Sequence, residues 1–216
     1  MSKTKFIETG LTFDDVLLVP SYSEVLPSDV DLLSKFSRNL SLKVPVVSAA
    51  MDTVTESKMA IAISKAGGIG VIHRNLEINK QLQEIRKVKR QKLFVGAAVG
   101  AGPKEFKRAE AILKENLDMI VVDTAHGHTK KVSEIIKFIK KKKNKKTALC
   151  AGNIATAEAA KFLHRLGVDI IKVGIGPGSI CTTRLVAGIG VPQLSAILEV
   201  KKGIKNKKAV SYTHLT

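Results

Sequence analysis

The segment Gly174-Ile-Gly-Pro-Gly-Ser-Ile-Cys-Thr-Thr-Arg184 carries the strongest chemical signal in the sequence. Its glycines let the backbone bend and point N–H or C=O groups inward, and its proline stiffens the turn. Hydroxyl groups and an arginine surround Cys181, and a thiol near positive charge or oriented amides forms the reactive thiolate more readily. The loop therefore predicts that Cys181 is a nucleophile presented to a phosphorylated, nucleotide-like substrate.

The other cysteine, Cys150, lies within a predicted strand among apolar neighbours, as an inert, buried thiol does. The same inert role is the alternative for Cys181, and its position in a glycine-rich loop at a strand end argues against it. Two cysteines in 216 residues are too few for a disulfide framework, and neither has a neighbour at metal-ligand spacing. Disulfides and a zinc site are therefore not expected.

Two further motifs place polar residues directly after predicted strands. In Asp123-Thr-Ala-His-Gly-His128 the carboxylate can accept hydrogen bonds from a ribose or hold a cationic group. The alternative is a helix-capping aspartate followed by two surface histidines. The His-x-His pair could bind a metal, but no third ligand is evident. Gly152-Asn153 is either a backbone turn or an amide that reads a sugar hydroxyl.

These motifs follow short apolar runs that alternate with amphipathic helical stretches. Nearly continuous apolar runs are typical of parallel strands whose faces are covered by helices. The predicted strands are 45–50, 70–73, 94–99, 119–123, 148–151 and 170–173. Three predicted helices have apolar stripes at Met59, Ala62, Ile63 and Ala66; at Val132, Ile135, Ile136 and Ile139; and at Ala159, Phe162, Leu163 and Leu166.

The ends of two of these helices also have sequence signals. Thr53 and Glu56 have the spacing of a capping box at the start of the first helix, and Gly67 is well placed to end it. Thr156 is a favourable N-cap for the third helix.

Repeated strand–helix units favour an α/β fold with a parallel sheet, either an open doubly wound sheet or a (β/α)₈ barrel. A dinucleotide-binding doubly wound sheet needs Gly-x-Gly-x-x-Gly after its first strand, and the segment 49–53 contains no glycine. Polar residues instead cluster after successive strands, as in barrel active sites. The sequence predicts a (β/α)₈ TIM barrel, incomplete because it shows about six strands of eight and a candidate start of a seventh at 208–210.

The composition is ordinary for a globular protein, with 44% hydrophobic and 25% charged residues. No apolar run is long enough to span a membrane, and the first ten residues lack the apolar core of a signal peptide, so a cytoplasmic location is expected. The net charge of +17 could attract nucleic acid or an anionic substrate. Because the lysines cluster at a helix end without interleaved aromatic residues, nucleic acid is not expected as a partner.

Several segments, in this order along the chain, resemble the IMP dehydrogenase/GMP reductase family. They are 11–20, 48–56, 67–70, 123–128, 151–156 and 172–184, and the resemblance extends to about Leu194. The last segment contains the Cys181 loop and is highly specific. GMP reductases share a similar cysteine loop, but the segments 48–56 and 123–128 fit the dehydrogenases better.

The resemblance implies a reaction and a set of site residues. Cys181 attacks C2 of IMP, hydride passes from C2 to NAD⁺, and water releases XMP from a covalent purine–cysteine intermediate. The implied residues are Cys181 and Thr183 for catalysis; Asp123, Gly174, Ile175 and Gly176 for NAD; Ser179, Met51 and Asn153 for the substrate; and the carbonyls of Gly176, Gly178 and Cys181 for a potassium ion. Family members are usually tetramers, which implies a homotetramer of the full-length protein.

The sequence departs from the family pattern in three places. The tandem CBS regulatory module is absent, since 86–90 leads almost directly into 92–96. The Asp-Gly-Gly strand, the eighth strand and the mobile flap that activates water are not found, so these 216 residues are expected to be unable to finish the reaction alone. Residues 210–216 do not read as the seventh strand, and 210–215 match what a common transposon-derived sequencing adapter encodes in one frame. This predicts a barrel domain at 1–209 and a non-native tail at 210–216.

Two alternatives to an IMP dehydrogenase fragment stay open. One is a GMP reductase-like enzyme that uses NADPH, and the other is a noncatalytic barrel fragment that binds nucleotides or nucleic acid. IMP-dependent formation of NADH distinguishes the dehydrogenase from the reductase. Salt-sensitive binding to single-stranded nucleic acid, without nucleotide labelling of Cys181, would favour the noncatalytic fragment.

Overall fold

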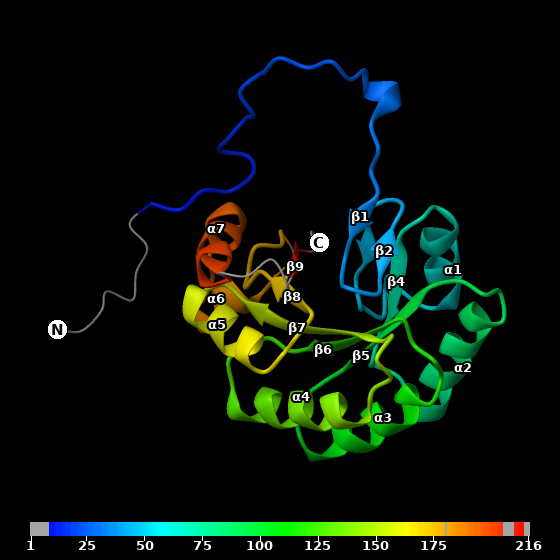
Figure 1. Ribbon diagram of the computed structural model, residues 1–216. Helices are drawn as coiled ribbons and strands as arrows, with labels where there is room; N and C mark the ends of the chain where they lie inside the picture. The colour runs from blue at the N-terminus through cyan, green and yellow to red at the C-terminus, as the bar shows by residue number, and fades with distance from the viewer. Residues whose placement is uncertain (1–8, 180, 205–209, 214–216) are drawn as a thin grey trace.

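The computed structural model describes residues 9–179, 181–204 and, for the backbone, 210–213. Its main sheet has seven parallel strands, whose order in space, β3-β4-β5-β6-β7-β8-β9, is their order in the sequence. A doubly wound sheet reverses its strand order at a switch point, so this unreversed order is that of a barrel wall. Figure 1 shows the sheet curling, with helices along its outer face. The predicted α/β fold, an incomplete TIM barrel, is confirmed.

The predicted strands all form. They are β3 (Val47–Ser48), β4 (Ile69–Ile72), β5 (Val95–Val99), β6 (Met119–Asp123), β7 (Ala148–Ile154) and β8 (Ile170–Val173). A further strand, β9 (Val210–Thr213), pairs in parallel with β8. The seventh strand of the sheet thus lies in the segment whose sequence does not predict a strand. The non-native origin of 210–216 stays a prediction. Residues 208, 209 and 214–216 lie outside the described residues.

Helices follow the strands and cover the convex side of the sheet. They are α1 (Ser57–Lys65), α2 (Ile78–Lys89), α3 (Pro103–Leu113), α4 (Lys130–Lys142), α5 (Ala157–Arg165), α6 (Thr183–Ala187) and α7 (Gln193–Gly203). The three predicted helices correspond to α1, α4 and α5. A short loop at 90–94 joins α2 to β5, at the position where the family's regulatory module is expected. Within the described part of the chain, no helix combines the length and apolar character needed to cross a membrane.

The helix-end predictions have different outcomes. Gly67 ends α1 with φ +99°, and the Thr156 side chain caps α5 by accepting a hydrogen bond from the Ala159 amide at 3.2 Å. The predicted capping box at the start of α1 is wrong, because Glu56 is the N-cap residue and makes no side-chain capping bond. Glu84 of α2 takes that role instead, and its carboxylate accepts the Ser57 amide at 2.8 Å.

Two apolar layers explain why the strands are almost continuously hydrophobic. Alternate side chains of each strand point outward to the helices, such as Ile120 and Val122, or inward to the concave face, such as Met119 and Val121. The hairpin of β1 (Ser34–Lys35) and β2 (Ser41–Leu42) contributes the buried side chains Phe36, Leu40 and Leu42 to the inner layer. The amino-terminal end of the barrel is thereby filled, which leaves the carboxyl ends of the strands for a site.

An extended segment leads into this hairpin. It contains one short 3₁₀ helix, η1 (Pro27–Asp29), and several highly exposed apolar side chains, including Leu17 and Leu18. In Figure 1 this blue segment arches from a point near α7 to β1.

Candidate active site

A cavity of about 280 Å³ opens at the carboxyl ends of the strands. The loops after β3, β4, β6 and β8 and the carboxyl end of β7 contribute to its wall, as expected for a barrel site. Nine of the residues predicted from the sequence line it: Met51, Asp123, Asn153, Gly174, Ile175, Gly176, Gly178, Cys181 and Thr183. Among the described residues, Ser179 is the one predicted site residue outside this lining, and its side chain is exposed.

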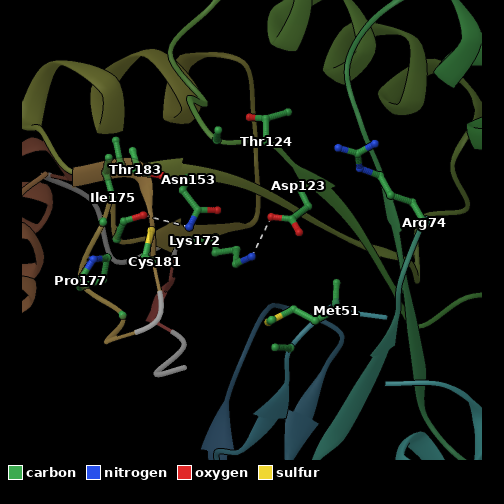
Figure 2. A pocket seen from close by; sticks show the side chains of 16 residues that line it. Met51, Arg74, Asp123, Thr124, Asn153, Lys172, Ile175, Pro177, Cys181 and Thr183 are labelled. Carbon is green, nitrogen blue, oxygen red and sulfur yellow. Dashed lines mark hydrogen bonds and ion pairs between the residues drawn. The ribbon is translucent and has the colours of Figure 1, made fainter. Parts of the chain in front are cut away.

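An ion pair forms the centre of the cavity floor. The Lys172 Nζ atom donates to Asp123 Oδ1 at 2.7 Å, with the two side chains 5% and 24% exposed. Figure 2 shows the pair between Cys181 on one side and Arg74 on the other. The carboxylate is therefore fixed by a cation from a neighbouring part of the sheet rather than by helix capping.

Strand register explains how Asp123 and Lys172 meet. Asp123 of β6 lies opposite Gly152 of β7, and Gly152 lies opposite Lys172 of β8. A Cβ atom on Gly152 would lie 2.4 Å from the Lys172 carbonyl oxygen and 2.6 Å from the Lys172 Cβ. There is no room for a side chain at position 152. The Lys172 side chain therefore crosses β7 over backbone atoms alone to reach Asp123.

Asn153 connects the fifth predicted strand to the cysteine loop. Its Nδ2 atom donates to the Gly174 carbonyl at 2.9 Å, and its backbone amide donates to the Thr124 carbonyl at 2.8 Å. The Thr124 hydroxyl in turn donates to the Gly152 carbonyl at 2.8 Å. These bonds fix the relative positions of the loop after β6, the end of β7 and the loop after β8. They use one N–H of the Asn153 carboxamide, and its predicted bond to a sugar hydroxyl stays a prediction.

The cysteine loop needs glycine at two described positions. Gly174 and Gly176 have φ values of +132° and +71°, which other residues adopt only with strain. The Cys181 amide donates to the Gly178 carbonyl at 3.1 Å, which closes a turn just before α6. This turn brings the thiol to the cavity wall.

The two cysteines have opposite electrostatic environments. A hydrogen bond from the Thr183 hydroxyl, then one from the Thr183 amide, lowers the pKa of the Cys181 thiol; burial opposes this and the Arg184 charge reinforces it. Burial raises the pKa of Cys150, which lies on the concave face of β7 with no exposure. Cys181 is the thiol that ionises more readily.

Thr183→Val is expected to raise the pKa of Cys181 and to move its alkylation by iodoacetamide to higher pH. Loss of one net hydrogen bond, about 1 kcal/mol, corresponds to a roughly fivefold slower reaction near neutrality. Because the folded-state pKa is lowered, the thiolate's contribution to stability is present above the unfolded-state pKa and is lost as the pH falls through the folded-state value. Rate–pH profiles from mass spectrometry of the Cys181 peptide measure the shift, and an unchanged profile would exclude this role for Thr183.

Sequence reasoning assigned no role to Lys172 or Arg74. The signal for Lys172 was a single charged residue in an otherwise apolar strand, at the inward-facing alternation. Arg74 follows β4, and its guanidinium lies against Gly100, where a Cβ would be 3.1 Å from the Arg74 Cζ. Both side chains line the cavity and make its cationic character greater than the predicted residues alone suggest.

The structure does not bring the His-x-His pair to the cavity. His126 and His128 are exposed, with ring centroids 6.4 Å apart, and neither lines the cavity. Within the described ranges no three His, Cys, Asp or Glu side chains gather as a metal site.

Comparison with known proteins agrees with this geometry. The family model for the "IMP dehydrogenase / GMP reductase domain" matches residues 10–212. The chain is 43% identical to inosine-5'-monophosphate dehydrogenase of Borreliella burgdorferi over 94% of its length and 62% of the relative's. It is also 43% identical to the enzyme of that name from Cryptosporidium parvum, over 90% of this chain and 58% of the relative.

A third relative, inosine-5'-monophosphate dehydrogenase of Streptococcus pyogenes, is 35% identical over 91% of this chain and 66% of its own length. The chain thus spans roughly 60% of the length of the two relatives with 43% identity. The alignment to the Streptococcus enzyme runs over 324 residues, more than this chain contains, so that relative includes inserted residues without a counterpart here. On these matches, the chain belongs to the IMP dehydrogenase/GMP reductase family.

Proposed function

We propose that this chain carries the nucleophile and cofactor-facing part of an NAD-dependent IMP dehydrogenase, which oxidises IMP to XMP in guanine nucleotide synthesis. The observation that carries the proposal is the Cys181 thiol, whose pKa is lowered, in a cavity at the carboxyl ends of the strands that also holds Asp123 and Lys172. A GMP reductase-like enzyme with NADPH is the second candidate, because the family description includes both activities. The three relatives reported above are named as dehydrogenases.

The Cys181 thiolate adds to C2 of the hypoxanthine ring and makes a C–S bond. The hydride on C2 then leaves with its electron pair, which regenerates the ring double bond in a covalent purine–cysteine intermediate. Water adds to C2, the C–S bond breaks, and XMP and the free thiol result; the proton of the overall reaction is released when the thiol ionises again to the attacking thiolate. Dividing one difficult displacement into two steps is the advantage of covalent catalysis.

NAD⁺, when bound, supplies the acceptor for the hydride. The residues present fit a dinucleotide, because a carboxylate at a strand end accepts the hydroxyls of a ribose well. Asp123 is such a carboxylate, and its ion pair with Lys172 holds it in place. Gly174, Ile175 and Gly176 form the adjacent wall. Met51 and Asn153 border the proposed IMP side of the cavity, and Ser179 is proposed for the phosphate.

A potassium site at the carbonyls of Gly176, Gly178 and Cys181 stays a prediction, and the arrangement described here does not favour it. The Gly178 carbonyl accepts from the Cys181 amide at 3.1 Å and from Arg184 Nη2 at 3.4 Å. A guanidinium and a potassium ion would compete for that oxygen, so cation binding requires Arg184 to move. A homotetramer of the full-length protein and a cytoplasmic location complete the proposal.

We expect the 216-residue chain, mixed with IMP and NAD⁺, to form at most one NADH per chain and then to stop with the purine attached to Cys181. The physical reason is that attack and hydride loss use residues of this cavity, whereas release of XMP needs an activated water. Absorbance of NADH and intact mass of the protein measure the two products. GMP with NADPH is the paired assay: oxidation of NADPH by GMP, with no product from IMP, would replace the proposal by the reductase.

A further inference from the structure

The amino-terminal segment of the described chain is attached to the first turn of α7. The Leu11 amide donates to Ser195 Oγ at 2.8 Å, and the Ser195 amide donates to the Leu11 carbonyl at 3.2 Å. Gly10 lies against Pro192, whose Cγ would be 2.6 Å from a Cβ at position 10. In Figure 1 the dark-blue start of the chain passes close to α7. Leu11 and Ser195 are 184 residues apart in the sequence, so this contact is a long-range contact of the fold.

The first residue of α7 reaches the origin of the cysteine loop. Gln193 is 3% exposed, and its Nε2 atom donates to the Val173 carbonyl at 3.1 Å. Its Oε1 atom lies 2.8 Å from the position of a Cβ on Gly174, so the carboxamide covers the Gly174 backbone closely. From the cavity side, Asn153 Nδ2 holds the Gly174 carbonyl at 2.9 Å. Two carboxamides therefore hold the loop where it leaves β8.

The residues before α7 support the outer side of the same loop. The Val191 amide donates to the Ile175 carbonyl at 3.0 Å. A second cavity of about 570 Å³ lies between residues 12–14 and this outer side. Gly176 and Pro177 line both this cavity and the one that contains Cys181. The cysteine loop thus separates the two cavities. The contacts on its outer side therefore fix the position of its inner side, which faces the cavity of Cys181.

We propose that Gln193 is a positioning residue for Cys181, and that the Leu11–Ser195 contact fixes Gln193 in place. The contact holds the first turn of α7, and Gln193 holds the end of β8 and Gly174. The loop then presents the thiol to the cavity, within reach of the Thr183 donors. The inference deepens the proposed function and rests on it only in that Cys181 is taken as the nucleophile. The amino-terminal segment becomes part of the active-site support, although none of its described residues lines the cavity of Cys181.

The test is the rate–pH profile of Cys181 alkylation by iodoacetamide in the full 216-residue chain. Gln193→Leu removes the donor at similar volume, and Ser195→Ala removes the acceptor at a partly exposed site. Each is expected to slow alkylation near neutrality by about two- to tenfold, the effect of one misplaced hydrogen bond to a thiolate, and to move the profile to higher pH. Ser195→Thr retains a hydroxyl and is expected to restore the profile of the unmodified protein.

Gln81→Leu is the matched control. Gln81 is also a fully buried glutamine on a helix, and its Nε2 donates to the His73 and Ala98 carbonyls at 3.0 and 2.9 Å, at the ends of β4 and β5. It is expected to lower the thermal unfolding midpoint without moving the Cys181 profile. An unchanged profile in folded Gln193→Leu, or an equal shift in Gln81→Leu, overturns the proposal. If Gln193→Leu does not fold, the proposal is tested by comparing the Cys181 profiles of Ser195→Ala and Ser195→Thr.

The same measurement separates this inference from the proposed function. Addition of IMP tests the proposed function, because bound nucleotide slows alkylation of a thiol in its site. Should IMP give no protection while the Gln193 and Ser195 variants still shift the profile, the nucleotide assignment fails and the positioning role stands. If IMP protects and all profiles coincide, the positioning role is wrong and the proposed function stands.

Discussion

Cys181→Ala is expected to abolish both the NADH burst and the covalent purine adduct while leaving the fold intact. The side chain lies in a loop at the cavity wall, so its loss creates no void in either apolar layer. Removal of a nucleophile that forms the covalent intermediate lowers such a reaction by roughly 10⁴-fold or more. Intact mass after incubation with IMP and NAD⁺ gives the adduct, and circular dichroism gives the fold.

Cys150→Ala is the matched control for this prediction. Its thiol is completely buried on the inner face of the sheet, and burial raises its pKa, so it does not take part in the reaction. Loss of the buried sulfur is expected to cost about 1–2 kcal/mol of folding free energy, with the burst per folded molecule unchanged. An adduct that persists in Cys181→Ala and disappears in Cys150→Ala would reverse the assignment of the nucleophile.

Lys172→Met is expected to have the largest effect on stability among substitutions in the cavity. It leaves the Asp123 carboxylate, 24% exposed, without the cation that now lies 2.7 Å from Oδ1. Removal of one partner of a largely buried ion pair costs about 3–5 kcal/mol, and the partial exposure of Asp123 places the expected loss near the lower end, about 3 kcal/mol. Urea unfolding monitored by circular dichroism measures the change in free energy.

Two further variants test whether the unpaired charge of Asp123 causes the loss of stability in Lys172→Met. Lys172→Arg keeps the positive charge and is expected to retain most of the stability. Lys172→Met combined with Asp123→Asn removes both charges and is expected to recover part of the loss, since no unpaired carboxylate is left in the cavity. Asp123→Asn alone completes the cycle. A double variant whose loss equals the sum of the losses in Lys172→Met and Asp123→Asn would show that the pair is not coupled and would remove Lys172 from the role of orienting Asp123.

The sequence predicted the wall of the fold because its signals are local. The segments that form β4 through β8 are short apolar runs between amphipathic helices, and burial on both faces is the reason that each run reads as continuous. The capping box at the start of α1 failed for a related reason. A local spacing suggested a partner within the helix, but the Ser57 amide found the Glu84 carboxylate of a neighbouring helix, 27 residues away.

In the candidate site, too, the sequence predicted the features with local signals and not those that depend on long-range contacts. Glycines at 174 and 176 are visible in sequence as a loop, and both have left-handed φ values in the structure. The roles of Lys172 and Gln193 are not visible, because each depends on a residue far away in the chain. Lys172 meets Asp123 across 49 positions, and Gln193 meets Val173 across 20. No local pattern encodes such distances.

By itself, the sequence determined the strand–helix alternation, the barrel class and the loop that carries Cys181, since periodicity and glycine placement act over a few residues. The tertiary structure alone decided which groups surround that thiol. Parallel register placed Asp123, Gly152 and Lys172 side by side, so that a missing side chain on the middle strand lets an ion pair form above it. Folding also placed Gln193 of α7 against the start of the cysteine loop, and it joined Leu11 to Ser195 of the same helix across 184 positions.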